Sequence, residues 1–217
     1  MRYKAVLLDM DGTVLDTLED LYNAVNHSLE QFGLPPVDRK TVRAGLGNGA
    51  ARLIHFCLPD QPEERIQQVI AYYMPWYDAH CRIETRPYAG ILPMMERLKA
   101  AGVKLAIISN KADPAVQELA AAFFPGLLET AVGESAVVRR KPNPDAVLAA
   151  AERMGLGVED CVYVGDSEVD LRTAENAGMA CICVTWGFRD EDQLLRSGAT
   201  LLAHDPAELE ALLCGQA

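Results

Sequence analysis

The segment YKAVLLDMDGT, residues 3–13, is a short apolar run that ends abruptly in two aspartates and a glycine. Residues Tyr3–Leu8 have mainly apolar, β-forming side chains, so they predict a buried strand. Asp9 and Asp11 are two residues apart, and in an extended chain their side chains project to the same side. Adjacent carboxylates repel each other unless a cation lies between them. The segment predicts a strand with a cation site at its end, although an ordinary Asp-Gly turn is the simpler alternative.

Four further β-rich runs follow, and helical segments lie between the later ones. The runs are Val103–Ile108, a weaker Glu129–Val132, Cys161–Val164 and Ala180–Val184. Strands that alternate with helices predict a parallel sheet with helices on both faces. The expected fold class is therefore α/β, with a Rossmann-like parallel sheet as the core.

One interval is too long for this pattern. Roughly 94 residues separate the first strand from the second, whereas a strand–helix–strand unit needs only about 30. The surplus is expected to be helical, with helices at Glu19–Phe32, Arg39–Ala44, Ala50–Cys57 and Pro62–His80. We therefore predict an α/β core made of residues 1–16 and 86–217, with an inserted all-helical cap at residues 17–85.

Four polar clusters follow predicted strands or precede a helix, at residues 9–13, 109–110, 140–142 and 165–170. Open parallel sheets bind ligands at the carboxyl ends of their strands, so we expect these loops to meet in one site. Ser109 and Asn110 offer a hydroxyl and an amide that can hold a phosphate oxygen. Lys141 would supply a fixed cation there. Asp166 and Asp170 are four apart and would share one face of a helix.

Each cluster also has a simpler interpretation. Ser109-Asn110 is compatible with a polar turn, Lys141 with a solvated surface residue, and the acids after residue 165 with the start of a helix. Helix capping does not explain why two strand ends both carry paired aspartates. Oxygen-only ligands of this kind suit Mg²⁺, which binds one or two carboxylates and shares phosphate oxygens.

The composition restricts the class of partner. The chain has 20 basic and 31 acidic residues, a net charge of −11, so nucleic acid and anionic membranes are unfavourable partners. No apolar run approaches the ~20 residues of a membrane span, and the aspartates interrupt the first apolar run before it resembles a signal peptide. The six cysteines are scattered without a C-x-x-C pair. Reduced thiols in a cytoplasmic protein are the expectation.

The four clusters, in this order, resemble the four motifs of the haloacid dehalogenase-like superfamily, and the resemblance covers nearly the whole chain. The quoted motifs are Asp9-Met10-Asp11-Gly12-Thr13-Val14, Ser109-Asn110, Lys141-Pro142 and Gly165-Asp166-x-x-x-Asp170. The helical insertion is similar to the cap of the subgroup that contains the phosphoglycolate phosphatases. The resemblance implies a Mg²⁺-dependent phosphatase that hydrolyses a small phosphate monoester.

The resemblance also implies a role for each motif residue. Asp9 would be the nucleophile that forms an aspartyl-phosphate, and Asp11 the general acid and then the base. Asp166 would bind Mg²⁺ with the Asp9 carboxylate and the main-chain carbonyl of Asp11, and Asp170 would support the metal's waters or Lys141. The residues expected to hold the phosphoryl group or the substrate are Thr13, Ser109, Asn110 and Lys141. Dehalogenase relatives lack the second aspartate, so Asp11 favours phosphate over halide.

Residues 45–50, GLGNGA, resemble the glycine-rich cap segment of the same phosphatases. A glycine-rich turn before a helix exposes backbone N–H groups that can bind an anion. We therefore expect Gly47 and Asn48, with Arg43 or Arg52 nearby, to face the non-reacting end of the substrate. A carboxylate there would suit phosphoglycolate, and a plain interhelical turn is the alternative.

Other activities remain compatible with the sequence. A phosphomutase or a pyrophosphatase would use the same core, and a phospho-accepting signalling module also phosphorylates an aspartate. Signalling modules of that kind are shorter and have no cap. We expect a small phosphorylated metabolite as the partner, with no nucleic acid and no membrane, and a monomer or homodimer.

Overall fold

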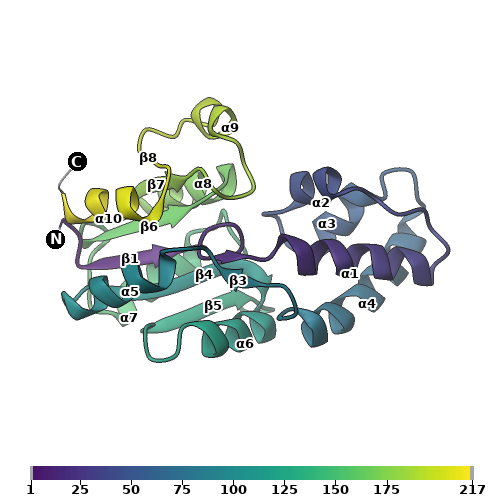
Figure 1. The fold of residues 1–217 in the computed structure, drawn as a ribbon, viewed down its shortest axis with the longest axis horizontal. Helices are drawn as coiled ribbons and strands as arrows, with labels where there is room; N and C mark the ends of the chain where they lie inside the picture. Colours follow the sequence, from purple (N-terminus) through teal and green to yellow (C-terminus); the bar gives the residue numbers. More distant parts are fainter. Residues whose placement is uncertain (1, 216–217) are drawn as a thin grey trace.

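The computed structural model describes residues 2–215. Within this range a six-stranded parallel sheet forms the core, in the order β5-β4-β1-β6-β7-β8 (Figure 1). The strands are β1 (Ala5–Leu8), β4 (Lys104–Ala112), β5 (Thr130–Glu134), β6 (Cys161–Gly165), β7 (Ala180–Val184) and β8 (Leu202–Ala203). The expected α/β class and Rossmann-like sheet are confirmed, and the segment quoted first is a central strand.

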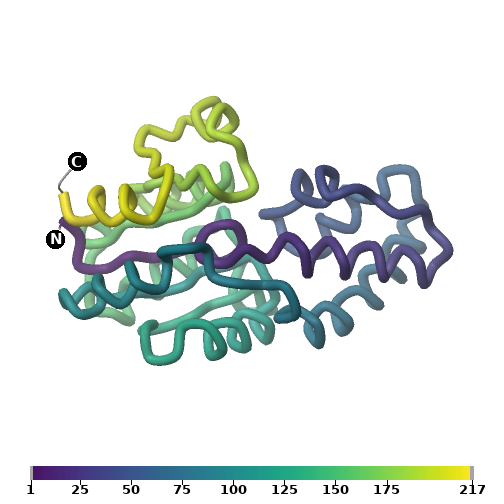
Figure 2. The backbone as a smooth tube through the Cα atoms, in the orientation of Figure 1, coloured from purple at the N-terminus to yellow at the C-terminus, as the bar shows by residue number. Residues whose placement is uncertain are grey.

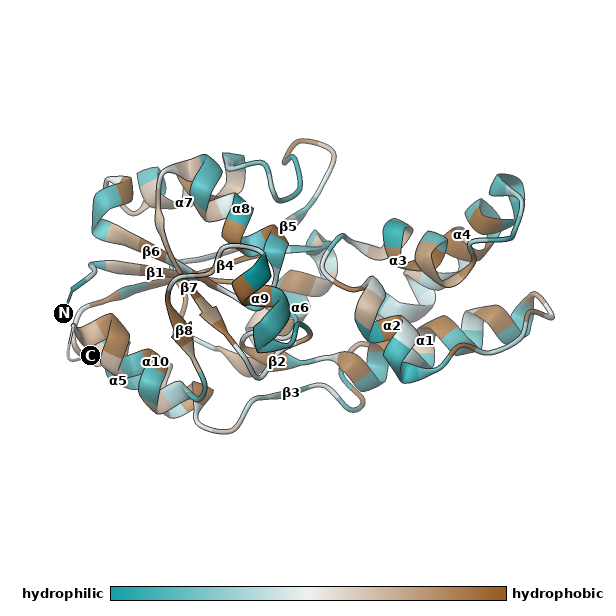
Figure 3. Ribbon diagram, turned by 90° about the horizontal axis from the view of Figure 1, so that it is seen from above, coloured by the Kyte–Doolittle hydropathy of each residue, from teal (hydrophilic) through white to brown (hydrophobic). Residues whose placement is uncertain are grey.

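Helices cover both faces of this sheet, as Figure 3 shows from above. Helices α5 (Ile91–Ala100), α6 (Asp113–Phe123) and α10 (Pro206–Cys214) pack on one face, while α7 (Asp145–Arg153) and α8 (Glu168–Ala177) pack on the other. A short α9 (Glu191–Arg196) and a 3₁₀ turn at Val158–Asp160 complete the core. Alternate residues of β1 contribute to opposite faces: Val6 and Leu8 to the first, Ala5 and Leu7 to the second. This two-sided burial explains why the strands are apolar throughout.

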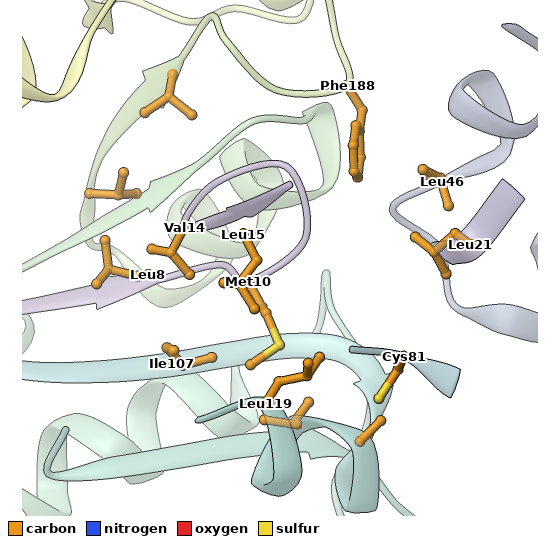
Figure 4. Packing of buried hydrophobic residues seen from close by; sticks show 14 of the residues in the cluster. Leu8, Met10, Val14, Leu15, Leu21, Leu46, Cys81, Ile107, Leu119 and Phe188 are labelled. Atoms are coloured by element: carbon orange, nitrogen blue, oxygen red, sulfur yellow. The ribbon is translucent and has the colours of Figure 1, made fainter. Parts of the chain in front are cut away.

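Between β1 and α5 the chain leaves the sheet and forms four helices, here called the helical unit (Figure 1). They are α1 (Leu18–Gln31), α2 (Arg39–Gly45), α3 (Ala50–Cys57) and α4 (Glu63–His80), within about two residues of the expected ranges. Helix α1 packs against α2 and α4, and α3 packs between the same two. The main apolar cluster extends from the sheet into this unit. In Figure 4, Phe188 of the core lies opposite Leu46 and Leu21 of the helical unit.

The chain passes between the sheet and the helical unit twice, and the two passages pair with each other (Figure 2). Strands β2 (Leu15–Asp16) and β3 (Arg86–Pro87) form an antiparallel ribbon. Next to it, the buried Asp20 of α1 accepts hydrogen bonds from the Thr85 hydroxyl at 2.8 Å and the Thr85 N–H at 2.9 Å. The sequence did not predict β2, β3 or β8, because strands of two residues have no periodicity to detect.

The first and last described segments lie together, since the Arg2 N–H donates to the Leu213 carbonyl. Cys57, Cys81, Cys161 and Cys183 are buried free thiols. Among residues 2–215, no helix is both long enough and apolar enough to span a membrane.

Candidate active site

The carboxyl ends of two paired strands bring three buried aspartates together. Asp9 directly follows β1, Asp166 directly follows β6, and Asp170 lies in the first turn of α8. Each offers a carboxylate oxygen, and the three oxygens lie within 4.8 Å of one another. The first and fourth sequence clusters therefore meet, at a spacing that allows the carboxylates of Asp9 and Asp166 to share one cation.

Lys141 joins two of these aspartates. Its ammonium nitrogen lies 2.8 Å from Asp9 Oδ1 and 2.7 Å from Asp170 Oδ1. It also donates to the Tyr163 hydroxyl at 3.0 Å, and its side chain is only 3% exposed. A buried charge needs such partners, because leaving it unpaired in the protein interior costs several kcal/mol. Lys141 is therefore a fixed cation of the site and not a solvated surface residue.

Burial and mutual repulsion make the carboxylates hard to ionise. Burial, helped by the charge of Asp170, raises the pKa of Asp9 to about 7, although Lys141 acts in the opposite direction. Burial also raises the pKa of Asp166 well above its usual range, and Asp170 and Asp9 add to this effect. For Lys141, burial lowers the pKa, but Asp170 and Asp9 outweigh it and hold the pKa well above the usual value. Three carboxylates around one ammonium form an excess of negative charge that favours a further cation.

Glycines allow the Asp166 carboxylate to lie against the backbone. A Cβ on Gly12 or on Gly187 would lie 2.4 Å from Asp166 Oδ2, closer than real contacts allow. Gly12 also has a φ of +80°, a backbone conformation that residues other than glycine rarely adopt. The same Asp166 oxygen accepts a hydrogen bond from the Phe188 N–H at 2.6 Å. These contacts fix one carboxylate oxygen of Asp166.

Asp170 caps helix α8 and also contacts Lys141. One of its oxygens, Oδ2, accepts from the N–H and the hydroxyl of Ser167, at 3.1 and 2.6 Å, as the acidic member of a capping box. The other oxygen, Oδ1, is the one that contacts Lys141. The helix-capping interpretation of this cluster is therefore correct for Ser167 and Asp170, and it coexists with the contact to the site.

A cavity lies over Asp9 and Lys141, between the sheet and the helical unit, and neither Asp166 nor Asp170 lines it. Its volume is about 60 Å³. Its polar floor includes Asp9, Asp11, Ser109, Asn110, Lys111 and Lys141. Its walls come from the helical unit and are largely apolar, with Leu21, Leu46, Leu53, Tyr73, Met74 and Tyr77. A small ligand enclosed here would touch charged groups on one side and apolar groups on the other.

Lys111 was not anticipated from the sequence. Strand β4 continues to Ala112, four residues beyond the predicted end, with an irregular register after Ile108. This extension places Lys111 in the cavity, where its ammonium lies 3.0 Å from Asp11 Oδ2. A lysine directly after Ser109-Asn110 was the available signal. Its partner could not be identified from local sequence.

Some of the remaining expected site residues line the cavity and others do not. Gly47 and Asn110 line the cavity, whereas Thr13 and Asn48 do not. The Asn110 amide is used within the protein: its oxygen accepts from the Lys141 N–H at 2.7 Å, and its nitrogen donates to the carbonyls of Gly47 and Lys141. Asn110 thereby fixes the Lys141 backbone and contacts the helical unit. Thr13 is fully buried, and its carbonyl accepts a hydrogen bond from the indole N–H of Trp186.

Neither of the two arginines expected near Gly47, Arg43 and Arg52, lines the cavity. Arg43 instead donates to the Gly187 carbonyl at 3.0 Å and to Asp190 at 2.9 Å. In the opposite direction, Arg189 donates to the Leu46 carbonyl at 2.8 Å. These reciprocal arginines connect the helical unit with the loop whose Phe188 N–H contacts Asp166. This connection was not predicted from the sequence.

The sequence profile of the family described as haloacid dehalogenase-like hydrolases matches residues 6–184 of the chain. A phosphoglycolate phosphatase from Xylella fastidiosa is 32% identical, over 94% of this chain and 90% of the relative. An N-acetylmuramic acid 6-phosphate phosphatase from Pseudomonas aeruginosa is also 32% identical, over 96% of this chain and 94% of the relative.

A crystal structure from Lactobacillus delbrueckii subsp. bulgaricus, of a protein provisionally assigned as a phosphoglycolate phosphatase, shares the fold. Its TM-score is 0.93 at 36% identity, with 98% of this chain and 99% of that chain covered. The match extends through the sheet and the helical unit alike. The chain therefore belongs to the haloacid dehalogenase-like hydrolase family, and it is a hydrolase with the α/β fold of that family.

Proposed function

We propose that the protein is a Mg²⁺-dependent phosphatase that hydrolyses a small, phosphoglycolate-like phosphate monoester through an aspartyl-phosphate on Asp9. The observation that supports it best is that Asp9, which lines the cavity beside Lys141, also lies close enough to Asp166 for the two carboxylates to share a cation. A phosphate dianion repels an anionic nucleophile, so a hydrolase of this type needs positive charge beside the attacking carboxylate. The membership of a hydrolase family argues against a phospho-accepting signalling module.

The residues of the site fit Mg²⁺ as the cation. Asp9 and Asp166 are oxygen donors, close together and too negative to be stable without compensation. We propose that their carboxylates and the main-chain carbonyl of Asp11 hold the ion, with Asp170 supporting through its contact to Lys141. Bound Mg²⁺ supplies charge neutralisation and polarisation of the phosphoryl oxygens.

The chain's own groups then divide the reaction. Asp9 attacks phosphorus and splits hydrolysis into two easier steps, while Lys141 and Ser109 hold the transferring phosphoryl group. Asp11 gives a proton to the departing alcohol oxygen and later removes one from the water that attacks the acyl-phosphate. Help of this kind is worth about 10²–10⁴ in rate. Asp11 lines the cavity beside Asp9, as this double role requires.

We further propose that residues 17–85 act as a cap, and that residues 1–16 with 86–217 form the catalytic core. The paired β2 and β3 segments connect the two parts, and cavity walls from the helical unit would exclude bulk water during the reaction. Gly47 would contact the substrate's non-reacting end. The small cavity favours an alcohol of few atoms.

The substrate is tested with a panel of phosphate esters assayed with Mg²⁺. The relatives named above act by their names on two different esters, phosphoglycolate and N-acetylmuramic acid 6-phosphate, so both belong in the panel together with sugar phosphates and pyrophosphate. We expect the highest kcat/KM for phosphoglycolate or an ester of similar size. A higher kcat/KM for the muramic acid ester or for pyrophosphate contradicts the small-ester proposal, and an isomerised product without phosphate release indicates a phosphomutase.

Metal binding is expected to depend on pH and to release protons. Because burial raises the pKa of Asp9 to about 7, the carboxyl binds a proton more readily near neutral pH than an exposed aspartate does. The proton competes with the metal, so Mg²⁺ affinity should rise from pH 6 to pH 8, by up to about tenfold per pH unit for each proton released. Isothermal titration in buffers of different ionisation enthalpy measures affinity and proton release without an activity assay. An affinity independent of pH contradicts the assignment of Asp9 as a ligand.

The composition of the chain supports a proposal for the cellular setting. Free buried thiols suit a reducing compartment, and we propose that the protein works in the cytoplasm on a small phosphorylated metabolite. The net charge of −11 opposes binding to nucleic acid or to an anionic membrane. A monomer or homodimer is sufficient for this site, because one chain supplies every proposed group.

A further inference from the structure

Lys111 is a buried lysine to which the reaction described above gives no role. It lies near the end of β4, its side chain is 4% exposed, and it lines the cavity. Burying an ammonium is costly unless it is paired and hydrogen-bonded. A structural need for a charged group at this depth is not evident, since an apolar side chain would fill the same space at lower cost.

The partners of Lys111 come from both parts of the molecule. Its ammonium lies 3.0 Å from Asp11 Oδ2, on the loop after β1. It also donates at 2.6 Å to the hydroxyl of Tyr77, on α4 of the helical unit, and lies 4.5 Å from the centre of that ring. Tyr77 is itself buried, at 4% exposure. Lys111 is therefore held between the proposed acid–base residue and the helical unit.

The two oxygens of Asp11 have different environments. Oδ2 is fixed by Lys111, whereas Oδ1 is buried and has no hydrogen-bond partner among residues 2–215. A buried oxygen without a partner is costly in a folded protein, and its presence points to a group that arrives from outside the chain. Asp11 lines the cavity, and Oδ1 is the oxygen of its carboxylate that no group of residues 2–215 occupies.

We propose that Lys111 is a positioning residue for Asp11, and that Tyr77 of the helical unit holds Lys111 in place. The inference rests on the proposed acid–base function of Asp11. In the first step Asp11 Oδ1 gives its proton to the ester oxygen while the bond from Asp9 to phosphorus forms and the ester bond breaks. In the second step Oδ1 takes a proton from water while the water oxygen bonds to phosphorus and the bond to Asp9 breaks.

The competing explanation is that Lys111 binds the substrate itself. An ammonium has three donors, and Asp11 and Tyr77 account for two of them. A substrate contact would be made in the ground state as well as in the transition state, so its loss would raise KM and leave kcat unchanged. A misplaced acid–base group has the opposite signature, because it lowers kcat.

The test compares Lys111→Met, Lys111→Arg and Tyr77→Phe with the wild-type enzyme and Mg²⁺ on two substrates. One is a small alkyl phosphate such as phosphoglycolate, and the other is p-nitrophenyl phosphate, whose leaving group departs without a proton. With the alkyl ester we expect Lys111→Met to lower kcat about 100-fold with little change in KM. Lys111→Arg should restore most of kcat, and Tyr77→Phe should lower it several-fold.

With p-nitrophenyl phosphate, formation of the aspartyl-phosphate can be measured separately from its hydrolysis. Lys111→Met should release a burst of one nitrophenolate per site and then turn over slowly, because aspartyl-phosphate hydrolysis still needs Asp11. The Tyr77→Phe effect should largely disappear in the Lys111→Met background, since the hydroxyl acts through the lysine. Lys104→Met, on the same strand but bonded to the Met154 carbonyl, is the matched control and should retain the wild-type rate.

Three results overturn the inference. A raised KM with unchanged kcat in Lys111→Met shows direct substrate binding, and equal losses on both substrates without a burst show a general structural effect. Wild-type kinetics in Tyr77→Phe exclude the contribution of the helical unit, and this variant serves if Lys111→Met fails to fold. Asp11→Asn separates the two levels: if it is inactive while Lys111→Met is normal, only the inference fails, and if Asp11→Asn is itself normal, the proposed function of Asp11 fails.

Discussion

Replacing Asp9 with asparagine is expected to abolish turnover, with kcat lower by on the order of 10⁵-fold, as for the loss of other covalent nucleophiles. The carboxylate oxygen that we propose attacks phosphorus is absent in the variant, whereas the shape of the side chain is retained. Asparagine can still accept through its oxygen from the Met10 N–H and from Lys141, which contact Asp9 Oδ1 at 2.7 and 2.8 Å. Phosphate release from the best ester of the panel, in the presence of Mg²⁺, measures the effect.

Mass spectrometry of acid-quenched enzyme separates the nucleophile from other roles. The wild-type enzyme should carry a phosphoryl group on Asp9 during turnover, and Asp9→Asn should carry none. Asp60→Asn, on an exposed loop, is the matched control and should retain the wild-type rate. Near-normal turnover in Asp9→Asn, or a phosphoryl group on another residue, excludes the aspartyl-phosphate on Asp9.

The features that the sequence predicted best are local ones. The apolar run before Asp9 and the acids after Gly165 can each be recognised within a few residues, and parallel pairing then brings both strand ends to one edge of the sheet. The helical unit was predictable because the interval between two strands was too long for a single crossover. Strand β4 shows the limit: its irregular end does not follow a period, so its last four residues were not predicted.

The residues that the sequence could not indicate are those defined by partners far along the chain. Lys111 donates a hydrogen bond to Tyr77, which is 34 residues away in the sequence. Arg189 donates a hydrogen bond to Leu46, which is 143 residues away. Both contacts cross the boundary between the core and the helical unit. A pattern read along one strand or helix carries no information on which side chain of another element lies opposite. Asn110 is a case in which the residue type was misleading. An asparagine amide can bind phosphate, but the amide of Asn110 forms its hydrogen bonds within the protein.

Replacing Lys141 with methionine is expected to affect both activity and stability. The variant loses the cation that lies 2.8 Å from Asp9 and 2.7 Å from Asp170. Without it, the proposed Mg²⁺ loses the cation that helps to compensate the charge of the Asp9 carboxylate and of the phosphoryl group, and kcat/KM should fall by on the order of 10³-fold. Removing one partner of a buried ion pair also costs about 3–5 kcal/mol of unfolding free energy.

The pH dependence of this stability loss has a definite sign. The pKa of Asp9 is already raised to about 7 in the wild-type protein, and losing the neighbouring ammonium raises it further. A group whose folded-state pKa lies above its unfolded value loses stability as pH rises toward the folded value. Urea unfolding in EDTA should therefore show a larger difference between Lys141→Met and wild type at pH 8 than at pH 6, and added Mg²⁺ should recover part of it.

An exposed ion pair provides the matched comparison for Lys141. Lys4 lies 2.9 Å from Asp160, a similar distance, but its side chain is 68% exposed. Solvent screening limits such pairs to about 0–1 kcal/mol, so Lys4→Met should unfold close to wild type and retain full activity. If Lys141→Met behaves like Lys4→Met in both assays, the lysine is not the fixed cation of the site. The difference between the two variants thus measures what burial and the additional contacts to Asp170 and Tyr163 add to an ion pair of nearly equal length. A large difference supports the proposal that the buried Lys141 holds a phosphoryl group against Asp9.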